Sequence, residues 1–409
     1  MRALIVSLLT LLSVVTGFGQ TDSVRVSLIT FFPGSEIFEL EGHTGLRIRD
    51  LRTHDDVIYN WGTFDFNSPG FVYRFVMGET DYTVAAAPTD LFLMAYEAQG
   101  RRIVEQELNL TPAETARLKA LVDENMLPEN RVYRYNYVLD NCATRPLAIV
   151  RRALASDTLA LAQAARPGQN TFRKVMRGYH CNYPWYQFGI DLALGSGIDR
   201  QIDNDARSFA PADLMTMVAD AGIRKVIIIV ADLGGADGSR RPLVGTTKVL
   251  NDIPADNAVR PATPSLLTPA AVAWAVFAIA LALSVADIRR RRLSAWFDVL
   301  FYSLCGLAGL LLTFLIFISV HEATSPNWLY LWLNPLCFIA AVGVVIKSAA
   351  KMVVSWQMLN FALLIILCGV GIAGVQSLNA AFWPLIGADM LRSITYIVIY
   401  RCNRSKKSS

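Results

Sequence analysis

The first two thirds of the sequence hold few side chains that bind metal ions. Residues 21–264 contain two cysteines and three histidines, namely Cys142, Cys181, His43, His54 and His180. An HExxH motif, a CxxC pair and carboxylates at metal-ligand spacing are all missing, which excludes a zinc hydrolase. There is also no GxSxG motif and no glycine-rich phosphate loop. The sequence therefore predicts a protein that uses no metal ion and no cofactor.

Charged residues are scarce as well. They make up 18% of the chain, whereas 53% is hydrophobic and the mean hydropathy is +0.36. These values are typical of a membrane protein and not of a soluble protein of 409 residues. The net charge is only +4, and no basic patch alternates with aromatic residues, so the composition excludes nucleic-acid binding.

The N-terminal sequence MRALIVSLLTLLSVVTGFGQ is typical of a secretory signal peptide over residues 1–20. It has one basic residue, Arg2, an apolar stretch from Ala3 to Val15, and small residues at Gly17 and Gly19. An uncleaved membrane anchor is the alternative. Either reading predicts that the following domain, residues 21–264, is exported.

Long apolar runs begin after the proline-rich linker NDIPADNAVRPATPSLLTP and define a second domain, residues 265–409. Each run is near the roughly 20 residues that cross a bilayer. The predicted spans are about 269–287, 297–319, 328–346, 356–376 and 382–400.

Basic residues fall in alternate loops between these spans. They are the RRRR run at 289–292, the pair Lys347 and Lys351, and the C-terminal RCNRSKK. The positive-inside rule places these three groups in the cytoplasm. The loops with His321 and Asn379, and the N-terminal domain, then face outward.

The exported domain mixes strand and helix patterns. DSVRVSLITFFPG and the hairpin HTGLRIRDLRTHDDVIYNWGTFDF have the β-branched and aromatic content of strands. TDLFLMAYEAQG and TPAETARLKALVDENM are predicted helices, and IRKVIIIVADLGG is a predicted buried strand. The domain is therefore expected to be α+β, followed by an all-α membrane domain of five spans.

Cys142 is the candidate nucleophile, in the stretch YVLDNCATRPL. Asp140 and Asn141 are good capping residues, so Cys142 is expected in the first turn of a helix. Free amides there would stabilise a thiolate and a later oxyanion. Asn141 is expected to position the site, and Arg145 either adds positive charge or bonds a loop.

His43 is the candidate base because it begins a predicted strand. The alternation of that strand puts it on one face with Gly45, Arg47 and Arg49. Asn60, on the return strand, can lie beside the imidazole and hold its tautomer, as the third member of a triad does.

Several simpler interpretations stay open. Cys142 and Cys181 can form a structural disulfide, as in many exported domains, or Cys142 can be a buried inert thiol. A lone histidine at a strand end, such as His43, is often structural. His180 is expected to be a surface or packing residue and His54 to be solvated in its turn.

The order of these residues resembles the circularly permuted papain-like (NlpC/P60-type) fold, in which the strand histidine precedes the helix cysteine. Lecithin retinol acyltransferase-like enzymes are similar here. The whole chain resembles the Lnb family of lipoprotein N-acyltransferases in the stretches GHTGLRIRD, NWGTFDF, DNCATRP, FGIDLALGSGIDRQI and NWLYLWLNPL. Where the acyltransferase relatives have a second histidine this chain has Asn60, so the resemblance leaves the third member of the triad open.

This resemblance implies a Cys142 nucleophile and a His43 base. The implied reaction moves an acyl chain from a phospholipid, through a thioester, to the α-amino group of a diacylated lipoprotein's terminal cysteine. It also implies a bacterial inner-membrane protein with a periplasmic N-terminal domain. A membrane-anchored papain-like peptidase or cell-wall amidase would use the same dyad, and a scaffold would leave Cys142 oxidised or buried.

Polar residues in the membrane half suggest a lipid-binding cleft at its outer end. Asp389 and Arg392 lie three apart on one predicted helix and are expected to pair. The further members of this candidate cleft are His321, Glu322 and Asn334. The alternative is that these residues only hold helices together.

Overall fold

The computed structural model describes residues 23–65, 67–79, 81–163, 168–224, 240–254 and 262–408, and the side chains up to residue 404. The predicted signal peptide, residues 1–20, lies outside the described residues. Most of the predicted strand IRKVIIIVADLGG does as well, because the described part ends with the strand β8, Gly222–Arg224.

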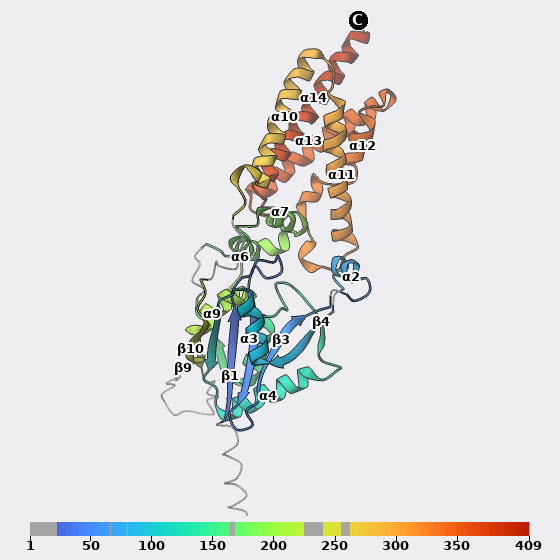
Figure 1. Cartoon of the computed structure of the whole chain (residues 1–409). Helices are drawn as coiled ribbons and strands as arrows, with labels where there is room; N and C mark the ends of the chain where they lie inside the picture. Colours follow the sequence, from blue (N-terminus) through green and yellow to red (C-terminus); the bar gives the residue numbers. More distant parts are fainter. Residues whose placement is uncertain are drawn as a thin grey trace, which may run out of the picture. The chain divides into compact units, whose positions relative to one another are not determined.

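The chain divides into two compact units (Figure 1). The first, here the sheet unit, consists of Met1–Pro69, Thr80–Gly168 and Ile202–Arg260. The second, the helical unit, consists of Gly70–Glu79, Gln169–Gln201 and Pro261–Ser409. The division is therefore not one point along the sequence, since two segments of the N-terminal half belong to the helical unit.

A seven-stranded sheet forms the centre of the sheet unit, with strand order β10-β5-β1-β2-β3-β4-β6. All neighbouring strands are antiparallel. The strands are β1 Val24–Phe31, β2 His43–Asp50, β3 Asp56–Thr63, β4 Asp81–Pro88, β5 Ile103–Leu108, β6 Val132–Arg134 and β10 Val244–Asn251. A second sheet, with order β7-β8-β9, joins Thr158–Ala160, β8 and Arg240–Pro242.

Alternation along the strands gives the large sheet two apolar faces. On one face, Leu28, Leu46 and Trp61 are buried with residues of three helices. On the other, Phe31 and Ile58 are buried beneath one helix. The three helices are α4 Pro112–Met126, α5 Thr144–Ala153 and α9 Pro211–Ala219, and the single helix is α3 Thr89–Ala98 (Figure 1). A short helix, α8, covers Asn204–Arg207.

The predicted helix start at Thr111 is present in the structure. Thr111 caps α4 by accepting from the Glu114 amide, Pro112 occupies the first turn, and Glu114 returns a bond to the Thr111 amide. This reciprocal pair is a capping box, which satisfies two amides that the helix itself leaves unpaired.

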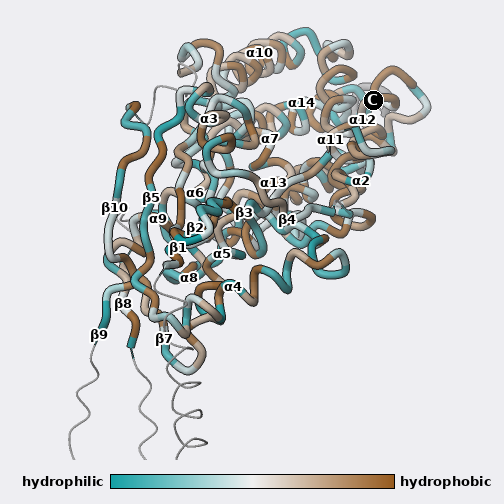
Figure 2. The backbone as a smooth tube through the Cα atoms, turned by 60° about the horizontal axis from the view of Figure 1, so that its bottom comes forward, coloured by the Kyte–Doolittle hydropathy of each residue, from teal (hydrophilic) through white to brown (hydrophobic). Residues whose placement is uncertain are grey.

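Among the residues that the structure describes, four helices are long and apolar enough to cross a membrane, and all belong to the helical unit. They are α10 Pro269–Arg290, α11 Ala295–Phe317, α13 Ala350–Ile372 and α14 Phe382–Ser408. Figure 2 shows the hydrophobic residues that run along them. The protein is therefore a membrane protein with a sheet-rich N-terminal part and a helical C-terminal part.

The predicted span 328–346 is not a single helix. It consists of a 3-10 turn, Trp328–Leu331, and the short helix α12, Cys337–Gly343. Pro335 stands between them and cannot donate a backbone hydrogen bond. At the break the Asn334 side chain replaces the missing backbone bonds, because it donates to the Tyr330 carbonyl and accepts from the Leu336 amide.

Two further helices of the helical unit come from the N-terminal half of the sequence. They are α6 Phe172–Tyr179 and α7 Pro184–Ala193. Phe188 and Leu192 pack against the apolar core formed by the long helices. Asn379, in the loop before α14, donates to Asp191 at 2.7 Å. The sequence stretch FGIDLALGSGIDRQI is thus an integral part of this unit.

Candidate active site

His43 and Asn60 lie side by side at one end of the sheet. His43 begins β2, and Asn60 on β3 is opposite Gly45 in the register. Its side chain reaches back along the strand, so that Asn60 Oδ1 is 2.5 Å from His43 Nε2. The hairpin therefore brings these two predicted site residues together.

This contact determines which ring nitrogen carries the proton. The Asn60 amide nitrogen donates to Thr63 Oγ1 at 3.2 Å, which directs the amide oxygen toward the imidazole. An amide oxygen only accepts, so Nε2 of a neutral His43 is the donor. Nδ1 then holds the lone pair that can take a proton.

Two glycines give the backbone its path around this site. Gly42, directly before His43, has a φ of 87°, and a Cβ there would lie 2.5 Å from the Phe31 carbonyl oxygen. Gly62 has a φ of 107° beside a register shift between β3 and β4. L-residues other than glycine rarely adopt such angles. The positions of the imidazole and the amide thus depend on glycine.

Cys142 lies against the same end of the strands. The backbone amides of Thr44, next to His43, and of Cys142 itself lower the pKa of its thiol. A Cβ on Gly62 would be 3.8 Å from the Cys142 Cβ. The thiol is 8% exposed and forms no hydrogen bond with the imidazole in the described structure. Catalytic contacts are often long before substrate binds.

Asn141 anchors the chain that carries Cys142. Its oxygen accepts from the amides of Ala143 and Thr144, and its nitrogen donates to the carbonyls of Tyr137 and Phe209. Asn141 therefore caps the start of α5, and its amide is fully used. The Ala143 and Thr144 amides are therefore committed to Asn141, and Cys142 lies in the turn before α5.

Arg145 is bonded to the loop before the helix. It makes two bonds to Asp140, at 2.7 and 2.6 Å, and its guanidinium lies 3.4 Å from the Tyr133 ring centre. Paired in this way, Arg145 fixes Asp140 and Tyr133, and its charge is largely compensated.

Burial keeps both reactive groups neutral at rest. Burial raises the pKa of the Cys142 thiol to about 11, although the amides of Thr44 and Cys142 oppose this. Burial also lowers the pKa of the His43 imidazole to about 4, although the bond to Asn60 favours the charged form. Cys142 is therefore a protonated thiol and His43 a neutral imidazole, and the two do not form a preformed thiolate and imidazolium pair.

Arg101 is the charged residue of the site that the sequence pattern does not reveal. It is 2% exposed, lies over the Tyr96 ring and donates to the Phe32 carbonyl and to Glu39. Its charge lowers the pKa of the Cys142 thiol and also that of His43. One nitrogen, Nη2, has no partner among the described residues. A single arginine after a turn carries no sequence signal for such a role.

The remaining cysteine and histidines of the first two thirds do not join this group. Cys142 and Cys181 are both free, so the disulfide alternative is wrong. His180 is buried and pairs with Gln187 at 2.7 Å, and His54 is exposed in its turn. Within the described ranges, no group of three or more His, Cys, Asp or Glu residues is placed to hold a metal ion.

The predicted lipid-binding residues have separate surroundings in the helical unit. His321 bonds the Phe75 carbonyl of the helix α2, Phe71–Met77, at 2.7 Å. Asn334 bridges the break before α12, and Glu322 is exposed. His321 and Asn334 therefore stabilise the polypeptide locally.

The expected pair of Asp389 and Arg392 is not formed. Asp389 accepts from Tyr302, Asn360 and Trp332 within the helical core. Arg392 instead bonds Asp298 and Asp287. The two lie three positions apart on α14, but their side chains turn toward different neighbours. Moreover, Asp287 and Asp298 flank the basic run at 289–292, so Arg392 lies toward the end of the unit that carries this run.

Two family models match the chain. The Lnb N-terminal periplasmic domain matches residues 14–178, and the Lnb transmembrane domain matches residues 261–403. No curated protein and no solved structure matches. The first match contains His43, Asn60 and Cys142, and the second contains α10, α11, α13 and α14 up to residue 403. The chain therefore belongs to the Lnb family, with a periplasmic domain followed by a transmembrane domain.

Proposed function

We propose that this protein is a lipoprotein N-acyltransferase with Cys142 as nucleophile, His43 as base and Asn60 as orienting residue. The observation that carries the proposal is the position of the Cys142 sulfur. The amide of Thr44, the residue after His43, lowers the pKa of this thiol, and Asn60 holds the tautomer of the His43 imidazole. Nucleophilic catalysis requires such a thiol, a base and a group that orients the base.

In the first half-reaction, Nδ1 of His43 takes the thiol proton while the sulfur attacks the ester carbonyl of a phospholipid. The Cys142 amide faces the developing oxyanion, and a donor of this kind contributes about 3 kcal/mol. The carbon–oxygen ester bond breaks, and the proton on His43 passes to the departing alcohol. A lysophospholipid leaves and an acyl thioester stays on Cys142.

In the second half-reaction, the α-amino group of a diacylated lipoprotein attacks the thioester. His43 accepts a proton from the amine, the carbon–sulfur bond breaks, and the sulfur recovers a proton from the imidazolium. The low pKa of His43, about 4, makes the imidazolium a strong acid that returns its proton readily. The product amide is more stable than the thioester, which drives the reaction forward.

A phospholipid donor requires a membrane, and we assign five crossings to the helical unit in the bacterial inner membrane. Leu293, Val344, Ala349 and Tyr400 belong to one cluster with Val353. The loop after α10, the end of α12 and the end of α14 thus share one end of the unit. The interrupted segment 328–346 then provides the third crossing, which agrees with the positive-inside rule.

The same assignment makes residues 1–20 a signal peptide and 21–264 a permuted papain-like periplasmic domain. Strand His43 precedes Cys142 in sequence, and the cysteine immediately precedes a helix packed on the sheet. That order and packing support the permuted fold.

The deciding experiment is mass analysis of lipoprotein N-termini from cells that carry wild-type or Cys142→Ala protein as their only such enzyme. We expect triacylated termini in the first and diacylated termini in the second. The isolated wild-type protein should also carry a hydroxylamine-sensitive acyl adduct on Cys142. Unchanged N-acylation in the variant would refute the proposal, and peptide cleavage without an adduct would support a peptidase or amidase.

A further inference from the structure

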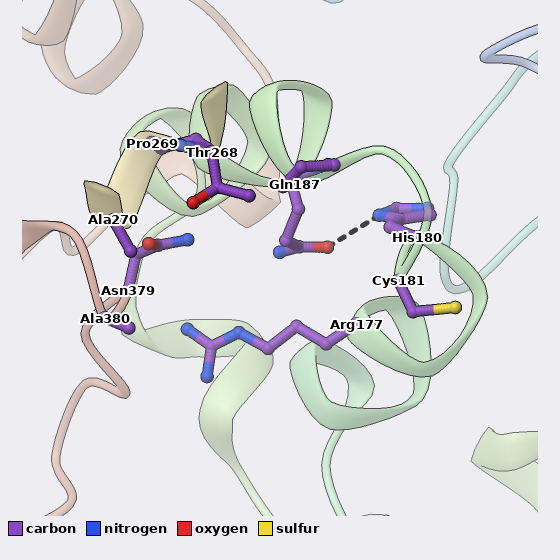
Figure 3. Close-up of a pocket in the computed structure, with 10 residues that line it drawn as sticks. Arg177, His180, Cys181, Gln187, Thr268, Pro269, Ala270, Asn379 and Ala380 are labelled. Atoms are coloured by element: carbon purple, nitrogen blue, oxygen red, sulfur yellow. Dashed lines mark hydrogen bonds between the residues drawn. The ribbon is translucent and has the colours of Figure 1, made fainter. Parts of the chain in front are cut away.

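A small cavity lies at the start of α10, within the helical unit (Figure 3). Its volume is about 210 Å³, which is below the roughly 300–1,000 Å³ of pockets for drug-sized ligands. It therefore suits one small group and not a whole lipid. Its polar lining comes from Arg177, His180, Gln187, Thr268 and Asn379.

Gln187 presents an unused donor to this cavity. Its Oε1 pairs with His180 Nδ1 at 2.7 Å, which fixes the amide orientation. Its Nε2 has no partner among the described residues, although Gln187 is only 8% exposed. Figure 3 shows this nitrogen pointing into the space between Thr268, Asn379 and Arg177. A buried donor without an acceptor is costly, so the arrangement favours a bound acceptor.

The first turn of α10 supplies a second donor. Thr268 caps the helix by accepting from the Ala271 amide, and Pro269 has no amide hydrogen. The Ala270 amide has no partner in the described structure and lines the cavity. The positive end of the dipole of this 22-residue helix adds to the attraction for an anion.

The charges around the cavity also favour an anion. Its lining includes one arginine and no carboxylate. Asp191 bonds two of the lining residues, and its two oxygens already accept from Arg173, Arg177 and Asn379. Arg177 is held in place by two bonds to Ser377, at 2.8 and 3.0 Å. A fixed guanidinium, an amide nitrogen and a helix terminus form a donor set suited to phosphate.

We propose that this cavity binds a phosphate group, namely the phosphodiester of a phospholipid headgroup in the outer leaflet. The surface next to it is apolar. Leu266 and Leu267 are 83% and 61% exposed, and Trp185, half exposed, donates to the Leu267 carbonyl. Such residues lie at the lipid–water interface, at the depth of headgroup phosphates. The assignment involves none of the Cys142 chemistry.

The test measures phospholipid binding to the full chain by native mass spectrometry in detergent. The background variant is Cys142→Ala, so that acyl transfer cannot consume the lipid. Phosphatidylglycerol is compared with diacylglycerol that has the same acyl chains. Gln187→Glu is the main variant, because it keeps the acceptor for His180 and replaces the donor with a negative charge. Gln201→Glu, at an exposed position outside the lining, is the matched control.

We expect one tightly held phosphatidylglycerol, weakened at least tenfold by Gln187→Glu and unchanged by Gln201→Glu. Diacylglycerol should show no such adduct. Equal binding in both Glu variants, or equal binding of diacylglycerol, would overturn the proposal. Inorganic phosphate should displace the lipid. If phosphate binds to the Gln201→Glu protein and no lipid adduct forms, the same donors serve free phosphate.

Discussion

Asn60 Oδ1 lies 2.5 Å from His43 Nε2 and joins two neighbouring strands of the sheet through their side chains. The bond leaves the other ring nitrogen as the proton acceptor, and it fixes the ring plane. Tyr96 lies parallel to the imidazole, with 7° between the two planes. The orientation of the His43 imidazole is thus fixed by Asn60 and Tyr96.

Replacing Asn60 with alanine should therefore slow catalysis without unfolding the protein. We expect the acylation rate to fall about 10- to 100-fold, because the imidazole then samples the wrong tautomer and orientation. Thr63→Val, which removes only the partner of the Asn60 nitrogen, should have a smaller effect. Single-turnover formation of the Cys142 acyl adduct measures both. A wild-type rate for Asn60→Ala would assign the orienting role elsewhere.

Alkylation by iodoacetamide should distinguish the two cysteines of the first two thirds of the chain. At neutral pH Cys181, which is exposed, should react first. Cys142 should react slowly, and its rate should rise about tenfold per pH unit up to a thiol pKa of about 11. Labelling of Cys181→Ser across pH 7 to 11, read by peptide mass spectrometry, isolates Cys142. Fast labelling at neutral pH would show a preformed thiolate.

The positive charge of Arg101 should lower the pKa of the Cys142 thiol. Because Arg101 lowers the pKa of Cys142, Arg101→Gln should shift the labelling profile to higher pH. Arg101→Lys keeps the charge and should shift it less. Arg102→Gln, at the adjacent and more exposed position, serves as the control. Identical profiles for the Gln and Lys variants would show that Arg101 acts through packing alone.

The low pKa of His43 predicts a stability change in weak acid. The unfolded chain takes up a proton near pH 6.5, whereas folded His43 does so only near pH 4. Stability contributed by this residue is therefore complete above pH 6.5 and is lost as the pH falls toward 4. The loss amounts to about 3 kcal/mol. Thermal unfolding in detergent across this range should show a shallower pH dependence for His43→Gln.

Arg392 should be essential to the helical unit. Arg392→Met would leave the buried carboxylates of Asp287 and Asp298 without their cation. Breaking a buried ion pair costs about 3–5 kcal/mol, so the midpoint of thermal unfolding should fall markedly. Arg289→Met, at an exposed position on α10, should leave it unchanged. Partial recovery in Arg392→Met with Asp298→Asn would confirm that the unpaired charge is the cause.

Local patterns predicted much of the fold and part of the site. The β-branched and aromatic residues from His43 to Phe66 predicted the hairpin of β2 and β3, and the TPAE stretch predicted the start of α4. These signals lie within a few residues of one another. The start of α5 differs slightly from expectation, because Asn141 caps it through a short turn and the helix itself begins at Thr144.

Features that depend on distant residues could not be predicted in this way. Arg392 bonds Asp298 and Asp287 on other helices. Asp389, the ion-pair partner that the sequence spacing predicted, accepts instead from Tyr302 and Asn360. The burial that keeps the Cys142 thiol protonated likewise comes from several strands at once. The spacing of residues along one helix predicts neither the partners on other helices nor the burial of a side chain.

The path of the chain between the two units limits how the protein can be divided. Residues 70–79 and 169–201 belong to the helical unit, although sheet-unit sequence surrounds them on both sides. A fragment cut at residue 264 would carry Phe188 and Leu192 without the core that covers them. Such a fragment would expose hydrophobic surface and aggregate. Expression of the periplasmic part alone therefore requires either a redesign of the apolar surfaces of α6 and α7 or retention of the helical unit.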